Sequence, residues 1–429
     1  MRVTLLHTND IHGRIDGLAR IATLVEQLRA SAGHRVIYVD AGDVEETTVR
    51  LSNLTKGVAM HRLLSAAGCE AAAVGNAVWL RYGQQVVAEQ ARVATYPLLL
   101  ANLVPVEGAR PTTLIDGVGF IGVTDPFRSF LATGVYGLTA LDEVGAVRET
   151  ARELRSQGAK FVVLLSHLGY SALEGRSDPV IVDPELAEHV QGDVDVIVGA
   201  HSHDLLPNGE RIGSVTIAQA GCYAEHLGRI DIADGEVRVS MIDVGEDVER
   251  HPRVLAAVAE AEESLDASLG ERIAELETPL DAAWIAEMLR ERMGAEIGLA
   301  TAGAMLDRPL PAGPLRRAEL WDVCHSTANP AVVELTGAQL ARMIERGNDS
   351  DFQQTTTRAL RGTPRGPLCV AGSSAIDSRR TYRVAATDFE LEHYGQLVDD
   401  DWQLSITYDF PTIVREAIEE HLERQATTR

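Results

Sequence analysis

The chain has few cysteines, and no two of them lie close together in the sequence. The four are Cys69, Cys222, Cys324 and Cys369. A zinc site built from cysteines usually contains pairs that are about two to four residues apart. Disulfide-stapled scaffolds are short chains with many more cysteines. A disulfide framework and a cysteine-ligated zinc site are therefore not expected.

Long apolar runs and an excess of basic charge are also missing. No run reaches the about 20 apolar residues that span a bilayer, and the opening RVTLLHT leads into polar residues, unlike a signal peptide. The formal net charge of -24 argues against a nucleic-acid polymer or an anionic membrane as the main partner, because both attract basic patches. We expect a cytoplasmic protein that binds neither.

The first half of the chain alternates short β-rich segments with amphipathic helical segments. RVIYVD (residues 35–40) and KFVVLLSH (160–167) are apolar, while GLARIATLVEQLRA (17–30) has helical periodicity. Apolar strands separated by helices predict a largely parallel sheet that is covered on both faces. Three later segments between residues 215 and 244 are predicted to form antiparallel strands.

The sequence pattern changes near residue 247. Residues 251–277 contain few turn-forming residues and predict a long helix, and a second mixed segment follows it. We therefore predict an N-terminal domain over residues 1–246, a connecting helix over 247–272 and a C-terminal domain over 273–429.

Seven polar side chains lie at or just after the carboxyl ends of predicted strands. They are Asp10, His12, Asp43, Asn76, His167, His201 and His203. Such strand ends meet at one edge of a parallel sheet, where α/β folds bind their ligands. Imidazole and carboxylate together favour zinc, manganese, iron, cobalt or nickel. Seven ligands suit two ions that share a carboxylate, and ions about 3.5–4 Å apart can clamp the attacking and leaving oxygens of a displacement at phosphorus.

Each motif alone has another interpretation. Gly75 and Asn76 form a pair that is typical of a turn. The acidic residues of GDVEE suit the start of a helix, and His167 suits a buried position in the core. The whole set favours a metal centre, because independent accidents would not all fall at the same sheet edge.

These residues also carry a resemblance to a known family. The motifs HTNDIHG, DAGD, VGN, LLSHLG and GAHSHD resemble those of the dinuclear metallophosphoesterases, in particular the branch of 5′-nucleotidases and 2′,3′-cyclic phosphodiesterases. The segments RAELWDV, AVVELTGAQLARMIERG and YRVAATDF are similar to the C-terminal substrate domain of that branch. The resemblance implies an α/β fold with a calcineurin-like αββα core and a C-terminal α+β domain of the 5′-nucleotidase type.

The resemblance also implies a metal arrangement and a reaction. Asp10, His12 and His203 would hold one ion, Asn76, His167 and His201 the other, and Asp43 would bridge them. Manganese and zinc are the first candidates, with iron, cobalt and nickel as alternatives. A hydroxide held by the two ions would attack a small phosphorylated substrate, with nucleotides as one candidate class.

The chain departs from the family pattern beside the metal motifs. In the family a His follows the Gly-Asn pair, and an Asp three residues later orients it. Here those positions hold Ala77 and Leu80. An Asn-x-Gly-Gly-Ile-Arg-like turn, whose Asn and Arg reach the substrate, is replaced by TAGAML at residues 301–306.

The aromatic clamp that holds the nucleobase in the family is hard to locate. Ser373 and Ser374 occupy the place where one ring is expected. Tyr394 and Phe410 are other candidates for a ring. The substrate-binding residues are therefore not assigned from the sequence.

Two classes of function follow from these observations. The first is a metal-dependent phosphoester hydrolase, which the complete set of seven ligands favours. The alternative is a catalytically weak or inactive protein that binds metal and a phosphorylated ligand on the same scaffold. The missing dyad and the missing arginine favour the alternative.

Restoring the dyad tests the first class. A positioned acid–base group contributes about 10²- to 10⁴-fold, so we expect slow turnover of generic phosphoesters. Ala77→His alone should help little, because an imidazole without a partner can adopt the wrong tautomer. Ala77→His with Leu80→Asp should raise kcat/KM for an aryl phosphate by more than the two single effects combined.

The assay uses a fixed manganese concentration, and folding is checked alongside because an unpaired buried carboxylate costs stability. A wild-type protein without activity that the folded double variant does not rescue would contradict the hydrolase interpretation.

Overall fold

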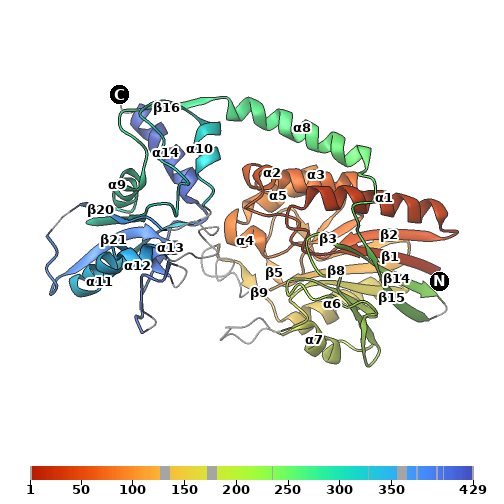
Figure 1. Cartoon of the computed structure of the whole chain (residues 1–429). Coiled ribbons are helices and arrows are strands. Elements are labelled where there is room, and N and C mark those ends of the chain that lie inside the picture. The colour runs from red at the N-terminus through yellow and green to blue at the C-terminus, as the bar shows by residue number, and fades with distance from the viewer. Residues whose placement is uncertain are drawn as a thin grey trace. The chain divides into compact units, whose positions relative to one another are not determined.

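The protein forms two compact units, Met1–Glu263 and Ser264–Arg429, in this computed structural model (Figure 1). The structure describes residues 2–125, 136–171, 181–233, 235–326, 328–354, 365–372, 375–392, 395–399 and 401–427. The division between the units falls inside helix α8 (Pro252–Leu269). The boundaries at residues 246 and 273 remain a prediction.

Two β-sheets form the centre of the N-terminal unit. The first has the order β15-β14-β1-β2-β3-β4-β6, and the second has the order β12-β13-β11-β10-β8-β7. The strands of the first sheet are β1 (Arg2–Thr8), β2 (Arg35–Asp40), β3 (Ala71–Ala73), β4 (Leu98–Leu99), β6 (Ala109–Arg110), β14 (His226–Ala233) and β15 (Glu236–Asp243). Those of the second are β7 (Thr112–Ile115), β8 (Val118–Thr124), β10 (Phe161–His167), β11 (Val196–Gly199), β12 (Glu210–Ile212) and β13 (Val215–Ala218).

Both sheets are parallel in the middle and antiparallel at an edge. In the first sheet β1, β2, β3, β4 and β6 run parallel to one another, and in the second sheet β8, β10, β11 and β13 do so. β14 and β15 are antiparallel, as predicted. The prediction was wrong for β13, which pairs parallel with β11 and antiparallel only with β12. β5 (Leu103–Val104) and β9 (Thr139–Ala140) form a separate antiparallel pair.

The two sheets face each other and helices cover their outer sides. One buried apolar cluster contains Leu5 and Val39 from the first sheet and Phe120, Leu165 and Val198 from the second. Figure 1 shows α1 and α3 on one side of the sheets and α6 and α7 on the other. The helices are α1 (Ile15–Ser31), α2 (Arg50–Leu54), α3 (Val58–Ala66), α4 (Ala77–Arg81), α5 (Gln85–Val93), α6 (Glu143–Ser156) and α7 (Asp183–His189). These layers confirm the predicted αββα core.

The C-terminal unit has the predicted α+β character. Its main sheet has the order β20-β17-β21-β19-β22, and β16 pairs with β18. Separate apolar clusters pack on the two faces of the main sheet. The strands are β16 (Arg272–Leu276), β17 (Ile297–Thr301), β18 (Gly313–Arg316), β19 (Pro330–Thr336), β20 (Leu368–Gly372), β21 (Thr381–Thr387) and β22 (Thr407–Tyr408). The helices are α9 (Ala282–Arg292), α10 (Arg317–Val323), α11 (Gly337–Gly347), α12 (Ser350–Gln353), α13 (Asp388–Leu391) and α14 (Val414–Thr427).

The helix predicted over residues 251–277 is shorter in the structure. α8 ends at Leu269, and Arg272–Leu276 form β16, which pairs antiparallel with β18. Gly270 follows the helix directly. Glycine is common at helix ends, because ordering its flexible backbone in a helix costs more entropy than for other residues. No helix in the described ranges combines the length and the apolar composition needed to cross a membrane.

Limited proteolysis tests the division of the chain. The first cuts should fall near residues 246–280 or within 351–367, because proteases cleave where the backbone opens locally. Residues 355–364 of the second segment lie outside the described residues. Mass spectrometry of early fragments identifies the sites. A first cut inside β1 would contradict this division.

Candidate metal centre

The structure brings three of the predicted ligands together around one carboxylate. The ligand atoms of Asp10, His12 and His203 all lie within 4.8 Å of one another. The two imidazole Nε2 atoms are 3.1 Å apart. Asp10 Oδ1 lies 3.7 Å from His12 Nε2 and 3.6 Å from His203 Nε2. This spacing can accommodate one cation between the three side chains.

A second group adjoins the first. His167 Nε2 lies 3.3 Å from Asp43 Oδ2 and 3.0 Å from Asn76 Oδ1. It also lies 3.9 Å from Asp10 Oδ1. The carboxylate that belongs to both groups of ligand atoms is therefore Asp10. The assignment of Asp43 as the bridging ligand remains a prediction.

His201 lies beside these groups, and one of its nitrogens faces a residue that the sequence analysis missed. Its ring centroid is 5.1 Å from that of His167. Its Nε2 lies 3.4 Å from Oδ2 of the fully buried Asp125. Asp125 follows the end of β8 directly, so the same strand-end pattern could have found it. An Nε2–H facing this carboxylate leaves Nδ1 as the atom available for an ion.

The backbone around the site is strained. Asp10, His12, Asp43, His201 and His203 have φ values of 48°, 46°, 57°, 72° and 61°. Non-glycine residues rarely adopt this left-handed conformation, and each costs on the order of 1–3 kcal/mol. Five of the seven predicted ligands therefore adopt a conformation that only the surrounding structure can maintain. Strain of this kind gathers at functional sites.

Two glycines make room for the ligands. A Cβ on Gly75 would lie 1.9 Å from Asp43 Oδ1, and one on Gly42 would lie 2.8 Å from His167 Nδ1. The backbone of Ala77 donates a hydrogen bond of 2.9 Å to Asp43 Oδ1. The Gly-Asn-Ala segment thus closes tightly on Asp43 and leaves its Oδ2 facing His167.

Hydrogen bonds to the backbone orient two imidazoles for metal binding. His167 Nδ1 donates to Ala41 O at 2.9 Å, and His12 Nδ1 donates to Glu45 O at 3.3 Å. In each ring this leaves Nε2, once deprotonated, as the nitrogen that can bind an ion, which is the usual arrangement of a metal-ligating histidine.

Asp10 is fixed by one oxygen and offers the other. Its Oδ2 accepts hydrogen bonds from Asn9 Nδ2 at 2.7 Å and from the backbone of His201 at 2.9 Å. Its Oδ1 is buried and has no hydrogen-bond partner among the residues that the structure describes. A buried carboxylate oxygen needs such a partner or a cation. The donor set therefore fits a bound divalent ion.

The electrostatics favour positive charge at this position. Burial alone would lower the pKa of His167, but Asp43, with a further contribution from Asp10, raises it to about 10. Burial alone would raise the pKa of the Asp10 and Asp43 carboxyls, but the imidazoles around them hold each pKa below its usual value. A divalent cation satisfies the same pair of carboxylates.

Several residues at which the chain departs from the family pattern cannot be placed. Ser373, Ser374 and Tyr394, and the side chain of Leu80, lie outside the described residues. The ring of Phe410 is stacked on Tyr408, with centroids 4.7 Å apart.

Two family models match the chain. The calcineurin-like phosphoesterase model matches residues 3–205, and the 5′-nucleotidase C-terminal domain model matches residues 258–398. The chain belongs to the calcineurin-like phosphoesterases that carry a 5′-nucleotidase C-terminal domain. This membership implies divalent metal ions and phosphoester hydrolysis as the activity of the family.

The relatives of this chain differ in how much of their length the chain covers. It is 27% identical to the uncharacterized metallophosphoesterase YunD of Bacillus subtilis (strain 168), over 92% of this chain and 90% of that protein. It is 27% identical to the 5′-nucleotidase of Diplobatis ommata, over 63% of this chain and 53% of that protein. The match with the 5′-nucleotidase of Bos taurus covers 39% of that protein, at 28% identity. The chain thus spans about half or less of these nucleotidases.

Solved structures share the fold of this chain. The 5′-nucleotidase precursor from Thermus thermophilus superposes with a TM-score of 0.57 at 19% identity, over 99% of this chain and 97% of that one. A putative 5′-nucleotidase from Staphylococcus aureus gives a TM-score of 0.61 at 15% identity, over 98% and 96%. At these identities the comparison supports the architecture alone.

Metal analysis tests the predicted ligand assignment. Protein purified without chelator should contain up to two transition-metal ions per chain. Asp43→Asn should lower the content of both ions, because a bridging carboxylate serves both. Asp10→Asn should affect mainly one. Elemental analysis gives the counts.

Asp116→Asn is the control, because Asp116 also has a positive φ but is exposed and paired with Arg35. It should keep both ions. If Asp43→Asn retained two ions per chain, the bridging assignment would be wrong.

Proposed function

We propose that this protein is a metal-dependent hydrolase of small phosphoesters, with nucleotides as the first class to test. The observation that supports this best is the buried Asp10 Oδ1, which has three imidazole Nε2 atoms within 3.9 Å and no hydrogen-bond partner in the described part of the chain. A buried anionic oxygen that faces three imidazole nitrogens suits a divalent cation, which displaces any proton from those nitrogens when it binds.

We assign the ligands as the sequence predicts. Asp10, His12 and His203 would hold one ion, Asn76, His167 and His201 would hold the other, and Asp43 would serve both. Manganese or zinc is the first candidate for each ion. When bound, such a pair supplies Lewis acidity and an activated water molecule at neutral pH.

Neighbouring groups of the protein orient the proposed ligands. The hydrogen bonds to Ala41 and Glu45 hold His167 and His12 in the ligating tautomer. The Asp125 carboxylate, 3.4 Å from His201 Nε2, favours a proton on that nitrogen and so favours Nδ1 as the ligating atom. Asn76 contributes a neutral oxygen, which limits the negative charge that a phosphate ester must approach.

A second candidate function rests on one specific observation. Ala77 occupies the position of the family's histidine at the start of α4. Without that imidazole the centre can retain its ions and bind a phosphorylated ligand with little turnover. The second candidate is therefore a binding protein on the same scaffold.

Turnover decides between the two candidates. Wild-type protein with added manganese should hydrolyse an aryl phosphate, and Asn76→Ala should abolish this activity because one ion loses a ligand. Asn208→Ala is the matched control, since Asn208 is exposed in a turn of the same unit. The measurement is kcat/KM, followed by a panel of nucleotides.

Full activity in Asn76→Ala would contradict the ligand assignment. No hydrolysis of any ester by a wild-type protein that holds both ions would support the binding function.

A further inference from the structure

The loop around Tyr223 is held in a strained conformation against the metal-binding loop. Tyr223 and Ala224 have φ values of 58° and 57°. The backbone N–H of Tyr223 donates to Asp10 O at 2.8 Å. A Cβ on Gly17 would lie 2.7 Å from the Cβ of Ala224, so α1 approaches this loop closely. Two consecutive left-handed non-glycine residues persist only where the surrounding structure holds them, and such strain clusters at functional sites.

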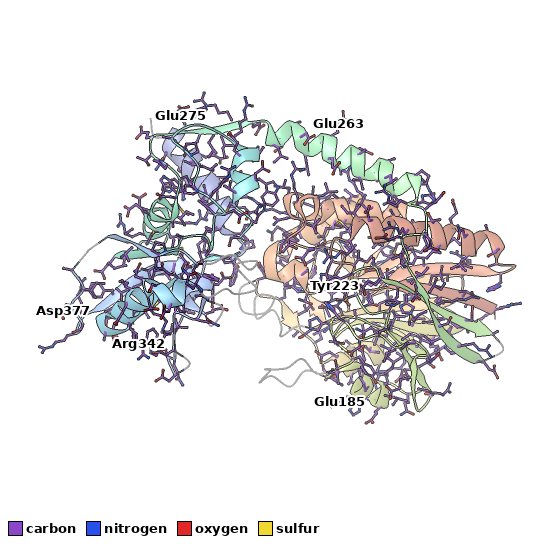
Figure 2. The ribbon with its side chains drawn as sticks, in the orientation of Figure 1. Glu185, Tyr223, Glu263, Glu275, Arg342 and Asp377 are labelled. Carbon is purple, nitrogen blue, oxygen red and sulfur yellow. The ribbon has the colours of Figure 1, made fainter. Side chains whose placement is uncertain are left out.

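This conformation places the Tyr223 ring at the border of the metal centre. Its centroid is 5.7 Å from that of His12 and 5.6 Å from that of His203. Figure 2 labels Tyr223 within the N-terminal unit. Its side chain is partly exposed, so the ring forms part of the wall of the site rather than of the core.

Arg14 lies over the same ring. Its Cζ is 4.7 Å from the Tyr223 centroid, which is within the range of a cation–π contact. Arg14 directly precedes α1 and is exposed. No carboxylate of the described residues forms an ion pair with its guanidinium. The neighbouring Asp16 pairs with Arg250 instead.

Such an arginine meets a chemical requirement of the proposed reaction. Negative charge is spread over the equatorial oxygens of a phosphoryl group during transfer. The planar guanidinium binds two such oxygens at once. The sequence lacks the histidine at Ala77, so the centre has lost one cationic donor.

We propose that Arg14, held over Tyr223, binds the non-bridging oxygens of the substrate's phosphoryl group. This inference rests on the proposed function. It makes Arg14 a catalytic residue, and Tyr223 a positioning residue that acts through it.

Phosphate binding tests this role without any need for turnover. Calorimetry with inorganic phosphate on the metal-loaded full chain should show a Kd about 10- to 100-fold higher for Arg14→Met than for wild type, because a charge-assisted pair is lost. The Kd of Arg14→Lys should lie between these two values, since lysine keeps the charge but cannot donate two parallel hydrogen bonds to the phosphate. Arg152→Met, an exposed arginine on α6, should match wild type.

The role of the Tyr223 ring is tested in the same way. Tyr223→Phe keeps the ring and should bind phosphate as wild type does. Tyr223→Leu removes the ring face and should weaken phosphate binding by less than Arg14→Met does. In turnover of an aryl phosphate, Arg14→Met should lower kcat more than it raises KM, because the contact strengthens in the transition state.

Three results would overturn the inference. The first is an unchanged phosphate Kd in Arg14→Met that still holds both ions. The second is loss of the ions in both Arg14→Met and Arg14→Lys, which would make the role of Arg14 structural. The third is equal weakening in Arg152→Met. A wild-type protein that binds phosphate through Arg14 but hydrolyses nothing would refute the proposed hydrolysis and leave this assignment standing.

Discussion

The buried carboxylate of Asp10 is the constraint on which the rest of the site depends. One of its oxygens is satisfied by Asn9 and by the backbone of His201, and the other faces three imidazoles. An uncompensated buried charge costs several kcal/mol. The fold brings the predicted ligands from both sheets to one point, where a bound cation would offset this cost for all of them at once. A cation bound here would thus contribute to the stability of the N-terminal unit as well as to the proposed reaction.

The sheets provide the rigidity that this arrangement needs. Loops with left-handed residues are unfavourable alone, and the predicted ligands include several of them. They persist because the strands before them belong to two sheets whose facing sides pack into one buried apolar cluster. The free energy of burying that cluster offsets the strain in the loops. This division of roles explains why the ligands follow strands so closely in the sequence.

Much of the site could be predicted from the sequence because strand ends are local signals. The parallel strands, their order of appearance and the polar residues after them are visible without any tertiary information. Asp125 follows the same rule, but a single acidic residue gave no reason to choose it. Tyr223 follows no rule of this kind, since its place beside Asp10, His12 and His203 depends on tertiary contacts. The end of α8 was also misjudged, because the pairing of β16 with β18 overrides the helical pattern.

The hydrogen bond from the Ala77 backbone to Asp43 separates two roles that one position can carry. The main chain at residue 77 orders the metal centre, and every residue except proline provides the same N–H. The side chain at this position is therefore free to vary without disturbing the ions. A histidine at this position, together with its partner at residue 80, could therefore be lost or regained while the main-chain contact to Asp43 is kept. Substitutions at this position can therefore change reactivity while the fold stays the same.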